Sequence, residues 1–214
     1  MSRRIKSPTR TISSRGPYPR FIGYFPCHKS KSLQLPFDSV TALKVGIHLE
    51  RRPNVVLMEF EPEELEYIVD GEPETCIPDY RLTINTGEMG WAEAKHDEAK
   101  LSAEDAERFR RHKALANERG MQHEVLFQKT LEKDGELDTV ILLRRYAQLE
   151  FPRSALTRAE QKLKSAHPLS LREYEARARA TSIYLSVVYY LLYHQRLPLL
   201  YKKFTLEEME LCRV

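Results

Sequence analysis

The sequence predicts an α/β domain with a mixed sheet flanked by helices, followed by a small helical domain. From residue 39 to residue 128 the apolar pattern gives a helix, hairpin-connected strands, a second helix and a last strand. Beyond residue 150, helix-capping patterns follow one another. A length of 214 residues suits one ordinary domain and a smaller one, since domains commonly hold about 100–200 residues.

Three segments are predicted: a flexible basic arm over residues 1–20, the α/β domain over 21–150 and the helical domain over 151–214. Every charged residue before Asp38 is basic. Such segments are typical of chains that order on a polyanion, so a nucleic-acid arm and a solubilising tail are both open interpretations. The stretch over residues 59–74, in contrast, is rich in acidic residues. It either lies away from a DNA track or helps to gather metal ions.

The first predicted helix covers residues 39–50, with Asp38 or Ser39 as its N-cap and its end before Pro53. Residues 55–60 (VVLMEF) form a short strand pattern.

Hairpin signals connect the next strands. Residues 64–69 alternate and meet an Asp-Gly pair, which is a strong hairpin signal. Residues 75–84 are predicted as the following strand, residues 85–87 (Asn-Thr-Gly) as its turn, and residues 90–96 as a further strand.

A second helix is predicted over residues 101–120, capped by Ser102 with Asp105 and stopped at Gly120. The strand that follows it, 122–128, therefore joins the sheet through a helical crossover. The remaining chain is predicted to be helical, with a long stretch broken near Thr181 and with capping boxes at Thr157/Glu160, Ser170/Glu173 and Thr205/Glu208.

Bulk features indicate a cytoplasmic protein. No apolar run reaches the roughly 18 residues that cross a bilayer, and the basic N-terminus has no apolar stretch behind it. The three cysteines, Cys27, Cys76 and Cys212, are too widely spaced for a disulfide framework or a cysteine-based zinc site.

Two carboxylates and a lysine stand on the neighbouring strands that the Asn-Thr-Gly turn connects. Asp79 can face Glu93 across the ladder, and Lys95 lies on the same face as Glu93, because side chains alternate along a strand. Carboxylates hold Mg²⁺, and a lysine steadies the attacking water or the charge on phosphorus, so this set suits phosphodiester cleavage. The carbonyl of Ala94 is a further candidate metal ligand.

A plain cross-strand ion pair between Lys95 and Asp79 is the competing interpretation, because charged triplets of this kind are common. Pro78 indicates that the strand bends or lies at an edge at Asp79. The Trp-Ala-Glu-Ala-Lys context is also more apolar than a solvated face.

The residues Pro78-Asp79-Tyr80 followed by Glu93-x-Lys95 resemble the core of PD-(D/E)XK nucleases. More of the chain is similar to one branch, the TnsA-like endonucleases of heteromeric transposases. The similar segments are Gly23-Tyr24-Phe25-Pro26, Lys29-Ser30, Phe37-Asp38-Ser39, Pro53-Asn54-Val55, Glu61-Pro62 and Tyr67-x-x-Asp70-Gly71. The resemblance covers about residues 20–130, and more loosely the helical tail.

This resemblance implies a restriction-endonuclease-like sheet, with a winged-helix-like arrangement as one form of the C-terminal domain. It implies cleavage of one strand of double-stranded DNA at transposon ends (the 5′ ends), with Mg²⁺ as cofactor and Mn²⁺ as substitute. The implied partners are a DDE-type, TnsB-like transposase subunit and an AAA+, TnsC-like ATPase regulator in a bacterial cytoplasm, with no membrane association.

The third carboxylate departs from the family pattern. Asp38 stands where the family's first helix has a glutamate, and Ala42 stands where a second acid is expected. We therefore choose Asp38 by position as the third metal ligand. A restriction or repair nuclease with the same core, and a non-catalytic DNA-binding assembly module, are the alternative functions.

Other charged residues have plainer interpretations. His96 is predicted to be a surface histidine rather than a general base, and the helix that carries His112 is predicted to present a solvated face. The basic stretch from Arg144 to Lys164 is predicted to contact DNA or a partner.

Overall fold

The computed structural model describes residues 4–7, 9–13, 20–69, 71–133 and 135–201. The chain divides into two units, with the boundary between Thr130 and Leu131 rather than after residue 150 as predicted. The reason is that α4 (Glu136–Arg144) buries Leu137, Val140 and Leu143 and packs against α7 (Leu185–Tyr193) within the second unit.

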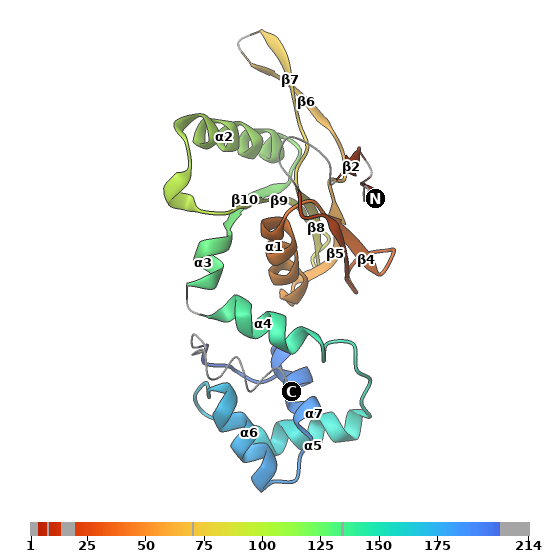
Figure 1. Ribbon diagram of the computed structural model, residues 1–214, viewed down its shortest axis with the longest axis vertical. Coiled ribbons are helices and arrows are strands. Elements are labelled where there is room, and N and C mark those ends of the chain that lie inside the picture. Colours follow the sequence, from red (N-terminus) through yellow and green to blue (C-terminus); the bar gives the residue numbers. More distant parts are fainter. Residues whose placement is uncertain (1–3, 8, 14–19, 70, 134, 202–214) are drawn as a thin grey trace. The chain divides into compact units, whose positions relative to one another are not determined.

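The first unit is built around a four-stranded mixed sheet in the order β10-β9-β8-β5, consisting of Gln122–Phe127, Met89–Lys95, Tyr80–Ile84 and Val55–Phe60 (Figure 1). Strands β5, β8 and β9 pair antiparallel. Strand β10 pairs parallel with β9 and is reached through α2 (Ala103–Glu118), which confirms the predicted helical crossover.

Helix α1 (Val40–Arg51) covers one face of this sheet. Of the two predicted N-cap candidates, Ser39 is the N-cap, and it accepts a hydrogen bond from the Ala42 N–H at 3.0 Å. Tyr80 is fully buried and donates its hydroxyl to the Ala42 carbonyl at 2.7 Å. Ala92 lies opposite Tyr80 in the register and therefore faces the same helix.

Helix α2 covers the other face, where Trp91 packs with Leu65, Cys76, Ala116 and Met121. Ser102 caps α2 by accepting a hydrogen bond from the Asp105 N–H at 3.0 Å. The predicted end at Gly120 is confirmed by its positive φ of 68°.

The predicted strand over residues 75–84 is wrong as a single element. It is split into β7 (Glu72–Cys76) and β8, and the break lies at Pro78. Strand β7 pairs with β6 (Leu65–Val69) in a separate two-stranded sheet, whereas β8 joins the central sheet. Proline cannot donate to a ladder, so the chain changes sheets at this residue.

Two further strand pairs precede this region: β1 (Arg4–Lys6) with β2 (Thr11–Ser13), and β3 (Gly23–Pro26) with β4 (Gln34–Phe37). The N-terminal segment is therefore not wholly unstructured, because residues 4–6 and 11–13 form an antiparallel pair.

The second unit is helical. After α3 (Gln128–Glu132), which spans the boundary, it contains α4, α5 (Arg153–Leu163), α6 (Leu171–Ala180) and α7. The Ser170/Glu173 capping box and the break near Thr181 are confirmed. Thr157 lies inside α5, which begins after Pro152, so the predicted cap there is wrong. Thr205, Glu208 and Cys212 lie outside the described residues.

Within the described residues, no helix combines the length and the apolar character that a membrane span requires. Within the described residues of the second unit, Leu169 and Leu199 form an isolated β-bridge.

Gly46 is required by the close approach of α1 to the sheet. A Cβ at this position would lie 2.7 Å from the Tyr80 hydroxyl and 2.9 Å from the Phe25 ring. We expect Gly46→Ala to lower the free energy of unfolding by about 1–3 kcal/mol through overpacking. Urea denaturation measures this change. Adding Tyr80→Phe should recover part of the loss, and a fully stable Gly46→Ala variant would contradict the packing.

Candidate functional site

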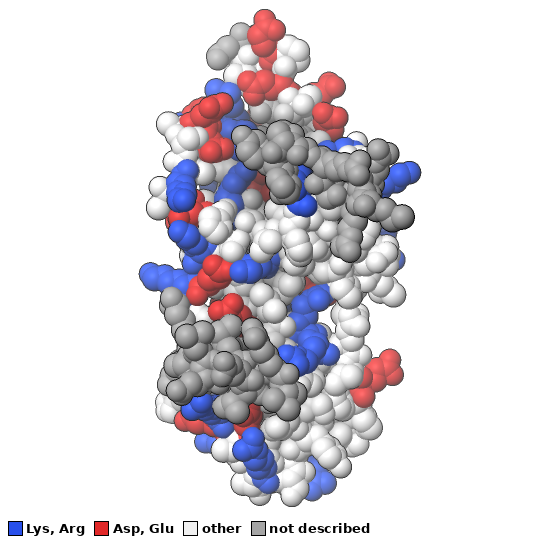
Figure 2. Space-filling model, viewed as in Figure 1, with Lys and Arg blue, Asp and Glu red and all other residues white. Residues whose placement is uncertain are grey.

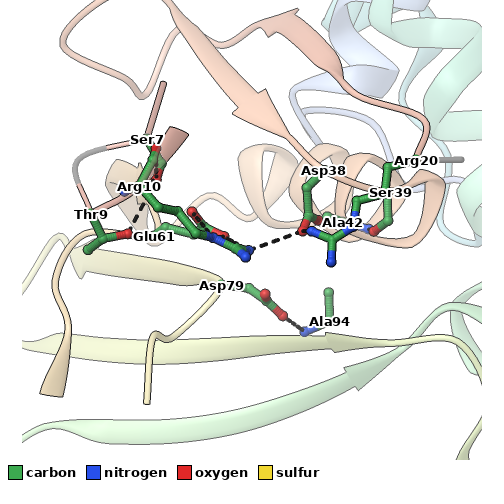
Figure 3. Close-up of polar contacts among 10 residues, drawn as sticks. All are labelled: Ser7, Thr9, Arg10, Arg20, Asp38, Ser39, Ala42, Glu61, Asp79 and Ala94. Atoms are coloured by element: carbon green, nitrogen blue, oxygen red, sulfur yellow. Dashed lines mark hydrogen bonds and ion pairs between the residues drawn. The ribbon is translucent and has the colours of Figure 1, made fainter. Parts of the chain in front are cut away.

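Asp79 lies where the chain passes from β7 to β8, directly beside strand β9. Tyr80 pairs with Ala92, which places Asp79 next to Glu93 across the ladder. The Ala94 N–H donates to Asp79 Oδ2 at 2.7 Å, as Figure 3 shows. The structure thus links Ala94 to Asp79 through its N–H, and the predicted role of the Ala94 carbonyl stays a prediction.

The environment of Asp79 opposes its negative charge. Burial is the main cause, and the charges of Glu93 and Asp38 add to it, so that the pKa of Asp79 rises to about 7. The Ala94 N–H and the Lys95 ammonium act in the opposite direction but do not outweigh these effects. Three carboxylates and Lys95 therefore interact at one edge of the sheet, and a bound cation would favour the ionised form of Asp79.

Asp38 lies at the start of α1, immediately before the N-cap, and its side chain is 20 % exposed. The Asp38 carboxylate is 3.3 Å from Arg10 and 3.8 Å from Arg20. Ala42, at the position of the expected second acid, is buried and contributes only its backbone groups.

A further acid, Glu61, belongs to this site. Its side chain is buried, its backbone has a left-handed φ of 42°, and its N–H donates to the Asp79 carbonyl at 2.9 Å. The guanidinium of Arg10 forms an ion pair with Glu61 and also contacts Asp38 (Figure 3). We call Asp38, Glu61 and Asp79 the carboxylate cluster. The acidic stretch 59–74 and the Glu61-Pro62 segment of the resemblance were the sequence signals at Glu61, but neither assigned it to the site.

The rest of that acidic stretch is distributed elsewhere. Glu59 and Glu63 form ion pairs with Arg81, and Glu74 lies 3.8 Å from Arg111. Figure 2 shows acidic side chains over the β6–β7 hairpin. Most of the stretch thus lies on this hairpin or in ion pairs, and Glu61 alone joins the carboxylate cluster among its described members.

Glu93 is buried and contacts two histidines that the sequence interpretation did not assign to the site. Glu93 Oε1 is 2.8 Å from His112 Nδ1 on α2 and 3.7 Å from His123 Nε2 on β10. Burial opposes the ionisation of Glu93, but the hydrogen bond with His112 and the close approach of His123 outweigh it and lower the pKa of Glu93 to about 2. We call Glu93, His112 and His123 the histidine cluster.

The predicted solvated position of His112 is wrong, because His112 is only 4 % exposed. Phe109, His112 and Ala116 are the buried residues of α2, at spacings of three and four, and so form its inward face. That spacing was the available sequence signal for His112. Its partner, His123, had none, because the contact depends on how α2 packs against the sheet.

Lys95 follows Glu93 on the same face of β9, as predicted. Its ammonium lies 5.3 Å from the centroid of the Phe109 ring, and its charge favours the ionised form of Asp79. His96 is exposed and its Nδ1 is 3.3 Å from Gln128 Oε1, which confirms a surface histidine.

The structure therefore brings the four predicted residues Asp38, Asp79, Glu93 and Lys95 to one edge of the first unit, and it adds Glu61, Arg10, His112 and His123. A search against models of protein families found no match to this chain, and a search of curated proteins found none either.

Proposed function

We propose that this chain is a Mg²⁺-dependent endonuclease that cleaves one strand of double-stranded DNA. The observation that carries the proposal is the convergence of Asp38, Asp79 and Glu93, with Lys95 beside them and with the pKa of Asp79 raised to about 7. A hard divalent cation is what such a group of oxygen ligands favours.

The element order of the first unit supports this proposal. Helix α1, the antiparallel strands β5, β8 and β9, the crossover helix α2 and the parallel strand β10 suit a restriction-endonuclease-like core of the PD-(D/E)XK type. Pro78-Asp79 directly precedes β8, and Glu93-x-Lys95 lies at the end of β9, the two central strands of the sheet.

The residues of the site fit a metal ion. Asp79 and Glu93 would hold Mg²⁺, or Mn²⁺ in its place, with Asp38 as third ligand and the Ala94 carbonyl as a further candidate. When bound, such an ion polarises the phosphate and lowers the pKa of a water molecule. The Ala94 N–H, 2.7 Å from Asp79 Oδ2, holds the Asp79 carboxylate in a fixed position in which it can bind the ion.

Lys95 is proposed to stabilise negative charge on the scissile phosphate or to orient the attacking water. Its partial exposure and its position two residues after Glu93 allow its ammonium to meet a substrate at the strand edge. In this arrangement Asp79 and Glu93 bind the metal ion. Lys95 contributes its positive charge to the phosphate or the water and does not transfer a proton.

The wider role follows the TnsA-like resemblance. The chain would cut at transposon ends beside a DDE-type transposase subunit and an AAA+ ATPase regulator. The second unit exposes five basic side chains from the C-cap of α4 to the C-cap of α5, which suit contacts with DNA or with these partners: Arg145, Arg153, Arg158, Lys162 and Lys164. Its winged-helix-like form stays a prediction.

The test is cleavage of duplex DNA that contains a transposon end, with and without partner subunits, in Mg²⁺, Mn²⁺ or EDTA. We expect strand cleavage that EDTA abolishes and that falls by at least about 100-fold in Asp79→Ala and Lys95→Ala. His167→Ala, an exposed histidine in the second unit, is the matched control. Full cleavage by either site variant would refute the catalytic assignment, and DNA binding without cleavage would favour an assembly module.

Arg10 competes with a metal ion for the carboxylate cluster, since its guanidinium contacts both Glu61 and Asp38. We expect Arg10→Gln to lower the Mg²⁺ concentration that gives half-maximal cleavage by about 3- to 10-fold, because removing one nearby positive charge strengthens cation binding by about 1 kcal/mol. The Mg²⁺ dependence of initial cleavage rates measures this. Lys31→Gln, which removes an exposed lysine 3.9 Å from Glu59, should leave it unchanged. A higher Mg²⁺ requirement in Arg10→Gln would contradict the competition.

A further inference from the structure

The histidine cluster is a second group of potential ligands, and its chemistry differs from that of the carboxylate cluster. One donor atom each from Glu93, His112 and His123 lies within 4.8 Å of the other two. The three side chains come from β9, α2 and β10, so they meet only when the crossover helix packs on the sheet.

The two histidine rings carry nitrogens that lack partners. The Nε2 atoms of His112 and His123 are buried and have no hydrogen-bond partner, while the side chains are 5 % and 3 % exposed. A buried polar atom without a partner destabilises a fold, so most such atoms in proteins are paired or bind a ligand. The unpartnered Nε2 of His123 lies beside the ionised Glu93 carboxylate and indicates a missing electron-pair acceptor, whereas His112 approaches the same carboxylate through its Nδ1.

The distances between the donor atoms suit a metal ion. Zinc bonds of about 2.0–2.2 Å to nitrogen and oxygen place the ligand atoms of a tetrahedral site about 3.3–3.5 Å apart. The separations from Glu93 Oε1 are 2.8 Å to His112 Nδ1 and 3.7 Å to His123 Nε2, on either side of that value. Only small side-chain adjustments would be needed to bring them to a common ion.

The donor set selects the class of ion. Two imidazoles and one carboxylate suit Zn²⁺ and related transition metals, whereas Mg²⁺ prefers oxygen ligands alone. The aromatic rings of Tyr67 and Phe109 pack edge-on against His112, with centroids 5.9 and 6.3 Å away. This apolar wall limits access of water and strengthens charge interactions inside the cluster.

We propose that Glu93, His112 and His123 form a buried binding site for a transition-metal ion of the Zn²⁺ class, which fastens α2 to strands β9 and β10. Both histidines approach the same oxygen of Glu93, Oε1. The proposal does not depend on nuclease activity, because it concerns the metal content and the stability of the chain.

The experiment measures metal bound to the full chain after purification without chelators, addition of Zn²⁺ and extensive dialysis, by plasma mass spectrometry. We expect about one zinc ion per wild-type chain. The same ratio is expected in His167→Ala, which removes a histidine outside the cluster, and in Asp79→Ala, which removes the proposed Mg²⁺ ligand. The double variant His112→Asn/His123→Asn should lose the ion. Zinc should also raise the melting temperature of the wild type and not that of the double variant.

Cobalt substitution of the wild-type chain keeps the test decisive if the double variant fails to fold. An intense visible absorption typical of four- or five-coordinate Co²⁺ with nitrogen ligands supports the site. A wild-type chain that retains no zinc, or a weak spectrum typical of six-coordinate Co²⁺, overturns it. Loss of cleavage in Asp79→Ala together with retained zinc would separate the two sites, and zinc binding without any cleavage would support this site while refuting the proposed nuclease.

Discussion

Asp79→Asn is expected to raise the free energy of unfolding of the metal-free protein at pH 8 by on the order of 2–4 kcal/mol. The carboxyl of Asp79 has a pKa of about 7 in the folded chain against an ordinary value of 3.8. The folded state therefore holds a proton that the unfolded state releases, and stability declines as the pH rises from about 4 through 7. Asparagine removes the buried charge, and its side-chain oxygen can still accept the Ala94 N–H.

Urea denaturation in EDTA at pH 4.5 and pH 8 measures this effect. The variant and the wild type should differ little at pH 4.5 and strongly at pH 8. Asp97→Asn is the matched control, because the ammonium of Lys129, 2.7 Å away, holds the pKa of Asp97 below its ordinary value. An Asp79→Asn variant that gains no stability at pH 8 would show that the carboxylate is not desolvated. Mg²⁺ should stabilise the wild type and not this variant.

Glu93→Gln is expected to have the opposite effect and to lower the free energy of unfolding by about 2–3 kcal/mol at neutral pH. The folded-state pKa of Glu93 is about 2 against an ordinary 4.5, despite burial, because His112 hydrogen-bonds to the carboxylate and His123 lies close to it. This stability is fully present above about pH 4.5 and is lost as the pH falls towards 2. Glutamine retains the shape of the side chain but not the charge.

The same denaturation series in EDTA, extended from pH 7 to pH 3, measures this loss. The difference between Glu93→Gln and the wild type should narrow below pH 4. Glu88→Gln, at an exposed position on the same hairpin, should change stability by less than about 0.5 kcal/mol. A Glu93→Gln variant as stable as the wild type at pH 7 would argue against an ionised Glu93 in the histidine cluster.

The two effects should not be additive, because the charge of Glu93 contributes to the raised pKa of Asp79. In the Glu93→Gln background, Asp79→Asn should therefore gain less stability at pH 8 than it does alone. A double-mutant cycle measures this coupling between the adjacent strands. If the two stability changes were strictly additive, the Asp79 and Glu93 carboxylates would not interact.

Chain-local chemistry predicted most elements of the first unit. Ser39 and Ser102 satisfy the first N–H groups of their helices, and Gly87 and Gly120 occupy left-handed backbone conformations. These interactions involve residues within about four positions, so their signals are visible in sequence. The predicted cap at Thr157 is wrong because the helix already begins after Pro152, five residues earlier in the chain.

Pro78 shows where local patterns become insufficient. The residue predicted a bend or an edge, and the bend is present, but the pattern did not reveal that β7 leaves the central sheet. Which strand pairs with which depends on the burial of distant residues such as Leu65 and Trp91. The domain boundary was misplaced for a similar reason, because Leu137 and Leu143 are buried in the second unit.

The sequence by itself determined the fold class, the turn that joins β8 to β9, and therefore the adjacency of Asp79, Glu93 and Lys95. Alternation along paired strands is enough to place these residues at one edge. Only the tertiary structure brought Arg10 and Glu61 to Asp38 and Asp79, and His112 and His123 to Glu93. These contacts join residues many positions apart, and they decide the charge states of the site because burial and neighbouring charges arise only when the helices and arms pack on the sheet.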